Sequence, residues 1–223
     1  MKKLCFLNFE GFLVNNLDYV VDEKKANFFI KKVFEFCKNN NIELFLISGL
    51  HEKVVLKKFE NSFLKEFITK EHFFFVTDEY ISLKHESDEQ LHIDNLKNNE
   101  FFVDSFFKQT IISKLLAEKN ISPNESILFC NDVWVDGYYT TKFSKSNFVI
   151  FENNITDRGK KIDKINGLIY FNFDSNPNEL FGELVIDYSS LNKYVFDVMK
   201  DVLLKDVDFS KLKKKLGVDN NAN

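Results

Sequence analysis

The sequence has few cysteines, and their arrangement argues against a disulfide framework. The 223 residues include three cysteines, Cys5, Cys37 and Cys130. Their odd number, wide spacing and apolar neighbours predict buried, reduced thiols in a reducing compartment. Cys130 lies next to the candidate site described below, so a reactive thiol is the alternative to inert packing at that position.

Arginine and long apolar runs are also scarce. Arg158 is the only arginine, and the formal net charge of −4 gives the chain no overall attraction to nucleic acid or anionic lipid. No run approaches the ~20 apolar residues that cross a membrane. The start of the chain resembles a signal peptide, but Asn8 and Glu10 interrupt its apolar stretch. We therefore expect a cytoplasmic protein with no membrane partner, and we do not expect nucleic acid as a partner.

Phenylalanine, by contrast, is abundant. The chain has 27 phenylalanines, and hydrophobic residues make up 44% of it, enough for a sizeable core. Because lysine and asparagine are common as well, we interpret this composition as the codon usage of an AT-rich bacterial genome. The length fits one α/β domain with an appendage better than two full domains.

Apolar strands alternate with amphipathic helices along most of the chain. The strands are expected over residues 3–9, 42–49, 72–77, 127–130 and 148–151. The helices are expected over residues 22–40, 51–67 and 109–120, with a shorter one near 133–143. This order predicts an α/β fold with a doubly wound, mostly parallel sheet over residues 1–151.

Two segments depart from this alternation. Residues 78–107 alternate apolar and polar side chains, which predicts a small β-hairpin insert. Residues 152–223 begin as a polar linker and continue as a strand, "LIYFNFD", and a helix over 191–207. We expect this C-terminal extension to pack on the core.

Polar side chains follow three of the predicted strands, and a lysine precedes the fourth. They are Asn8 and Glu10 after the first strand, Ser48 after the second, Lys108 at the expected start of a helix, and Asp132 and Asp136 after the fourth. Ligands of open α/β sheets bind at these carboxyl ends. Oxygen-rich groups beside a lysine suit Mg²⁺ and phosphate. Turn formation, helix capping and a solvated lysine are the structural alternatives for the same residues.

The order and spacing of these residues resemble the haloacid dehalogenase (HAD) superfamily of phosphohydrolases. The four motifs of that family correspond to "LNFEGFL", "LFLISG", the lysine of "FFKQTIISKLL" and "NDVWVD". Each motif is weak alone, but four in order are fairly specific. The resemblance covers roughly residues 3–151.

The resemblance assigns a role to each position. Asn8 stands where the family has the aspartate that attacks phosphorus, and Glu10 stands where it has the acid that protonates the leaving group. Ser48 would bind a phosphoryl oxygen and Lys108 would neutralise its charge. Asp132 would hold Mg²⁺, with Asp136 supporting it.

The departures from the family fall on the chemistry. Asn8 offers a neutral amide in place of a nucleophilic carboxylate, so Mg²⁺ binding is expected to be weak or absent. Phe12 also replaces a threonine of the family. We expect a HAD-like pseudoenzyme, a binding or regulatory protein without phosphatase turnover, whose open site takes a protein or other macromolecule.

Two alternatives stay open. One is an active Mg²⁺-dependent phosphohydrolase with a non-standard nucleophile, such as a metal-activated water with Glu10 as base. The other is a structural interaction protein that acts through its tail or its aromatic surface.

Overall fold

A computed structural model describes several stretches of the chain, all of them within one compact unit, Met1–Ile186. The described residues are 2–9, 13, 22–49, 52–75, 101–131, 136, 140, 143–152 and 168–182. Residues 78–100 of the hairpin insert expected over residues 78–107 lie outside them, as does the helix expected over 191–207. The division of the chain at residue 151 stays a prediction.

The described strands form one parallel sheet of six strands. These are β1 (Leu4–Asn8), β2 (Glu43–Ser48), β3 (Phe73–Phe75), β4 (Ser126–Cys130), β5 (Asn147–Phe151) and β6 (Tyr170–Phe171). Their order in the sheet is β3-β2-β1-β4-β5-β6, and every neighbouring pair is parallel. The predicted α/β class with a parallel sheet is confirmed.

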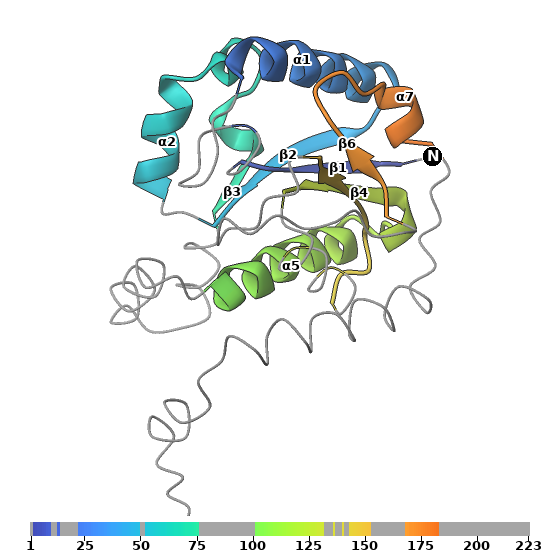
Figure 1. Cartoon of the computed structure of the whole chain (residues 1–223). Coiled ribbons are helices and arrows are strands. Elements are labelled where there is room, and N and C mark those ends of the chain that lie inside the picture. Colours follow the sequence, from blue (N-terminus) through green and yellow to red (C-terminus); the bar gives the residue numbers. More distant parts are fainter. Residues whose placement is uncertain are drawn as a thin grey trace, which may run out of the picture. The chain divides into compact units, whose positions relative to one another are not determined.

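Helices cover both faces of this sheet (Figure 1). Helices α1 (Glu23–Asn39), α2 (Glu52–Glu60) and α7 (Pro177–Leu180) lie on one face, and α5 (Phe101–Glu118) lies on the other. Every residue of β1, β4 and β5 is buried, as expected of strands covered on both sides. Among the described helices, none combines the length and the apolar character needed to span a bilayer.

The ends of α1 follow from its flanking polar residues. The carboxylate of Asp22 accepts a hydrogen bond from the backbone N–H of Lys25, at 3.1 Å, and so caps the first turn. Beyond the last turn Asn41 has a φ of 55°, a left-handed conformation that asparagine adopts more readily than most residues. Asn120 ends α5 in the same way, with a φ of 52°.

The boundaries of two helices differ from the prediction. The helix expected over residues 51–67 ends at Glu60, and a separate 3-10 turn, Phe63–Glu66, begins after Ser62. The hydroxyl of Ser62 accepts a hydrogen bond from the backbone N–H of Leu64, which starts this new turn.

The helix expected from residue 109 begins at Phe101, inside the stretch expected as a hairpin. Lys108 is therefore within α5 and does not open it, contrary to the prediction. Residues 101–107 contain no glycine or proline that would stop a helix from forming there.

Aromatic rings fill the core beneath α1. Phe171 of β6 is fully buried, and its ring centroid lies 5.5 Å from that of Phe29 and 5.0 Å from that of Phe129. Phe173, Leu180 and Phe181, which follow β6, are buried in the same cluster. Residues 168–182 thus complete the hydrophobic core that the first five strands begin.

Candidate functional site

The carboxyl ends of β1 and β4 meet at the centre of the sheet. Asn8 is the last residue of β1, and Asn131 follows the last residue of β4. The strand order reverses between these two neighbouring strands, which is where open α/β sheets form their ligand sites. Asn8 is only 2% exposed, so its amide must find its hydrogen-bond partners inside the protein.

The amide nitrogen of Asn8 joins two neighbouring side chains. Nδ2 donates one hydrogen bond to Oδ1 of Asn131, at 2.9 Å, and another to Oδ2 of Asp136, at 3.1 Å. An ionised carboxylate can only accept hydrogen bonds, so the nitrogen of Asn8, and not its oxygen, must face Asp136. Both hydrogens of the Asn8 amide are therefore used within this group.

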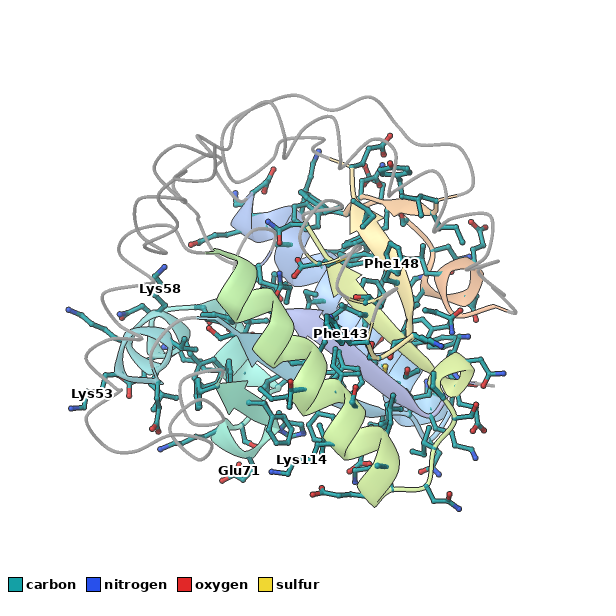
Figure 2. The ribbon with its side chains drawn as sticks, turned by 90° about the horizontal axis from the view of Figure 1, so that it is seen from below. Lys53, Lys58, Glu71, Lys114, Phe143 and Phe148 are labelled. Carbon is teal, nitrogen blue, oxygen red and sulfur yellow. The ribbon has the colours of Figure 1, made fainter. Side chains whose placement is uncertain are left out.

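Lys108 approaches the other oxygen of the same carboxylate. Its Nζ lies 3.4 Å from Oδ1 of Asp136, and the two side chains are only 11% and 4% exposed. Lys114, further along α5, is exposed, as Figure 2 shows from the side of this helix. Each oxygen of Asp136 thus has a donor nearby, and its negative charge is balanced inside the protein.

The carbonyl oxygen of Asn8 is the unsatisfied atom of this group. Oδ1 is buried and has no hydrogen-bond partner within the described part of the chain. A buried acceptor without a donor costs roughly 1–3 kcal/mol. This oxygen is where a donor group of a bound molecule would be most favourable.

A second set of buried polar residues links the helix that carries Lys108 to the segment that carries Asp136. The Gln109 side chain donates from Nε2 to the Thr140 hydroxyl, at 3.0 Å, and accepts from the Ser144 hydroxyl at Oε1. The Thr140 hydroxyl in turn donates to the backbone carbonyl of Asp136, at 2.6 Å. We call Gln109, Thr140 and Ser144 the amide clamp; it ties α5 to the segment that follows β4.

The amide clamp was not predicted from the sequence. A signal for it does exist, because Gln109 shares helical spacing with the buried Ile112 and Leu116. A glutamine on an apolar helix face needs a partner in the core. No sequence pattern, however, points to Thr140 and Ser144 as the partners.

Ser48 lies at the same edge of the sheet as Asn8. It is the last residue of β2, is fully buried and pairs in register with Phe75 of β3. The ladder between β1 and β2 continues one residue further, where the N–H of Phe9 donates to the carbonyl of Ile47 at 2.9 Å. Ser48 is therefore one strand away from the group formed by Asn8, Asn131, Asp136 and Lys108.

The remaining predicted residues fall outside the described part of the chain. These are Glu10, Phe12 and Asp132. Within the described residues, no three His, Cys, Asp or Glu side chains are grouped closely enough to hold a metal ion. The structure thus places Asn8, Lys108 and Asp136 in contact, and the catalytic and metal-binding roles of all these residues stay predictions.

An open cleft of about 710 Å³ lies at the opposite edge, where the strands begin. Lys2, Lys3 and Glu125 line it. Lys3 forms an ion pair with Glu125 at 2.8 Å, and this contact lowers the pKa of the glutamate. Burial lowers the pKa of Lys2, whose ammonium donates to a backbone carbonyl. The lining therefore has charges of both signs.

The chain was also compared with known proteins. No model of a known protein family matches it, and no curated protein matches it significantly either.

Proposed function

We propose that this chain is a HAD-like pseudoenzyme, a binding or regulatory protein that does not turn over phosphate esters. The observation that carries the proposal is the hydrogen bonding of the Asn8 amide. Its two N–H groups point at Asn131 and Asp136, whose oxygens are the kind of ligand that Mg²⁺ needs. In this arrangement the amide hydrogens take the place that a cation would have between the oxygens.

The same amide argues against covalent catalysis. An aspartate at position 8 would present an anionic oxygen to phosphorus, whereas the Asn8 amide carries no anionic oxygen. Loss of a covalent nucleophile typically lowers the rate by about 10⁴ to 10⁶. Lys108 is also paired with Asp136 already, so part of the positive charge that would attract a phosphate is balanced.

Binding without turnover remains chemically reasonable at this edge of the sheet. The buried Oδ1 of Asn8 lacks a donor within the described residues, and Ser48 lies one strand away. We propose that any Mg²⁺ binds here weakly, in about the millimolar range, since few charged oxygens are available to replace its waters. Residues 76–100, which separate β3 from α5, are too few for a large cap domain that would cover the site. An open site can take a large partner, so a macromolecule is the partner class that we propose.

Phosphatase assays of the wild type and of two variants test the proposal. The wild type should hydrolyse no phosphate ester above background in Mg²⁺. Asn8→Asp combined with Glu10→Asp should restore a trace of hydrolysis, and Asn8→Asp alone should restore less. EDTA should abolish whatever activity the variants gain, because the restored route needs the metal.

The two alternative functions predict different results in the same experiment. Wild-type turnover that both EDTA and Asp132→Ala abolish would establish an active phosphohydrolase and end the pseudoenzyme proposal. Three results together would favour an interaction protein that works through another surface. The wild type would be inactive, neither variant would gain activity, and both substitutions would leave partner binding unchanged.

A further inference from the structure

Lys2 is a buried lysine that no carboxylate neutralises within the described part of the chain. Only 7% of the residue is exposed, and its Nζ donates to the backbone carbonyl of Asn124. None of the ion pairs between described residues includes it. Lysine is seldom buried without a charged partner, because burial takes its ammonium away from water. An ammonium has three hydrogens, so two remain for another acceptor.

Lys2 lines the open cleft of about 710 Å³ at the edge where the strands begin, and the acids of that cleft already have lysine partners. Among the described residues of the lining, these acids are Glu43 and Glu125. Glu125 pairs with Lys3 at 2.8 Å. Glu43 pairs with Lys119, whose Nζ lies 2.8 and 3.0 Å from its two carboxylate oxygens. Neither glutamate therefore neutralises Lys2.

Lys38 is the other lysine of the lining that makes no ion pair with a described residue. Lys2 and Lys38 thus give the cleft a surplus of two positive charges. A smaller cleft of about 330 Å³ shares Lys38, but Glu43 and Glu71 line it and Lys2 does not. The positive surplus is therefore a property of the larger cleft.

The last turn of α1 also ends at the larger cleft. Unpaired carbonyls at the end of a helix would repel an anion. Here the carbonyl of Phe36 accepts from the backbone N–H of Asn40, at 3.1 Å, and that of Cys37 accepts from Ile42, at 2.8 Å. These carbonyls are paired, so they weaken the attraction of the lysines for an anion less than free carbonyls would.

We propose that this cleft binds a small molecule that carries a phosphomonoester and an apolar group. A phosphomonoester has a charge of about −1.5 to −2 near pH 7, which matches the surplus of two lysines. Its oxygens accept hydrogen bonds from Lys2 and Lys38. The apolar group contacts Cys37, Ile42 and Ile121, which line the same cleft. The proposal does not depend on the pseudoenzyme function, because this cleft is at the opposite edge of the sheet from Asn8.

Phenylphosphonate is the probe, since phosphatases do not cleave its P–C bond and turnover elsewhere cannot disturb the measurement. NMR titration of the ¹⁵N-labelled full-length chain should give a dissociation constant of about 1 mM, as expected for so small a ligand. The largest shifts should fall on the backbone amides of residues 2–3, 38–42 and 121–125. Benzoate has a single charge and should bind about 3-fold more weakly. Benzyl alcohol, which has none, should leave these amides unshifted.

Lysine variants test the two charges separately. Lys2→Met should weaken phenylphosphonate binding about tenfold or more, because it removes a buried, charge-assisted hydrogen bond. Lys38→Met should weaken it about 3-fold, because this side chain is exposed. Lys58→Met, an exposed change on α2 that Figure 2 labels, is the matched control and should leave the affinity unchanged.

Four results would each overturn the proposal. The first is no saturation by phenylphosphonate at about ten times the expected dissociation constant. The second is equal affinity for benzoate or benzyl alcohol, and the third is a set of shifts confined to Asn8, Ser48 and Asn131 at the other edge. These three come from the wild type alone, so they decide the question even if a variant fails to fold. The fourth is a folded Lys2→Met protein that binds as tightly as the wild type.

Discussion

The amide nitrogen of Asn8 lies between Oδ1 of Asn131 and Oδ2 of Asp136. Its two hydrogens allow these oxygens to be close, because each oxygen accepts one of them. Replacing Asn8 with aspartate would leave three oxygens facing one another at the distances now spanned by hydrogen bonds, 2.9 and 3.1 Å. One of the neighbours, Asp136, would then be a second carboxylate in the same buried space. Such a group is stable only with a proton or a cation between its members.

We therefore predict that Asn8→Asp lowers the free energy of unfolding by about 2–4 kcal/mol in EDTA, since two buried hydrogen bonds become repulsive contacts. Mg²⁺ at 100 times its dissociation constant should restore about 2.7 kcal/mol of this loss. Urea unfolding of both proteins, with and without Mg²⁺, measures the effect. The wild type should show little response to the metal.

A second variant serves as the control. In Asn8→Asp combined with Asp136→Asn the amide has changed places with the carboxylate, so the repulsion and most of the response to Mg²⁺ should disappear. Equal stabilisation of the wild type and Asn8→Asp by Mg²⁺ would show that the Asn8 amide does not stand in for a cation.

At the scale of elements, the amide clamp fixes the position of α5 against the segment that follows β4. Gln109→Leu would remove both hydrogen bonds of the Gln109 side chain and leave the Ser144 hydroxyl without its acceptor. We expect a loss of about 2–4 kcal/mol in the free energy of unfolding. Glu118→Gln, an exposed change in the last turn of the same helix, should stay within about 0.5 kcal/mol.

Gln109→Glu separates the hydrogen bonding of the clamp from its packing. A glutamate can still accept from Ser144, but its second oxygen would face the Thr140 hydroxyl, whose hydrogen already goes to Asp136. This variant should regain stability as the pH falls and the glutamate is protonated. An unfolding free energy equal to the wild type at neutral pH would show that the clamp contributes little.

The strand β6 is short, but its Phe171 ring is central to the core. Phe171 contacts the rings of Phe29, Phe129 and Phe151 at centroid distances of 5.5, 5.0 and 5.4 Å. Phe171→Ala should lower the free energy of unfolding by about 3–5 kcal/mol, because it opens a cavity among these rings. The control is Phe28→Ala on α1, where the ring is 62% exposed, so the loss should be well below 1 kcal/mol.

The sequence predicted the elements that have strong local signals. The apolar runs that became β1, β2 and β4 end in polar residues, and the apolar positions of α1 recur at helical spacing. The start of α5 was missed because residues 78–107 were assigned to a hairpin insert from their alternation of apolar and polar side chains, whereas α5 begins at Phe101. The end of α2 was missed although Ser62 carried the signal for a new turn.

The candidate site was predictable to a similar degree. Asn8, Lys108 and Asp136 were proposed from strand ends and motif spacing, and the fold brings them into contact. The partners of Gln109 could not be predicted, because a buried polar contact between distant segments depends on tertiary packing and leaves no local pattern.

At the scale of the whole molecule, the core does not end with the fifth strand. A chain that stops at Phe151 would lack β6 and the buried residues that follow it, including Phe171 and Phe181. We predict that this shorter chain is largely unfolded or aggregated by circular dichroism and gel filtration. A chain that stops at Ile186, where the first compact unit ends, should keep the cooperative unfolding of the full protein.

The same pair of chains tests the boundary that the sequence suggested at residue 151. Cooperative unfolding of the chain ending at Phe151, with unchanged stability, would show that residues 168–182 are an appendage and not part of the core. Pull-downs that ask whether the tail binds a partner should accordingly compare the full chain with the one ending at Ile186.

The position of β1 at the centre of the sheet has a consequence for protein synthesis. β1 leaves the ribosome first and can pair with β2 early, but its other neighbour, β4, begins only at Ser126, long after β2 ends at Ser48. At roughly 5–20 residues per second, synthesis of the intervening ~80 residues lasts on the order of 4–16 s. During that time the innermost strand of the finished protein is an edge strand, with unpaired backbone groups and apolar side chains on both faces. The nascent chain should therefore need protection by chaperones until Cys130 has emerged.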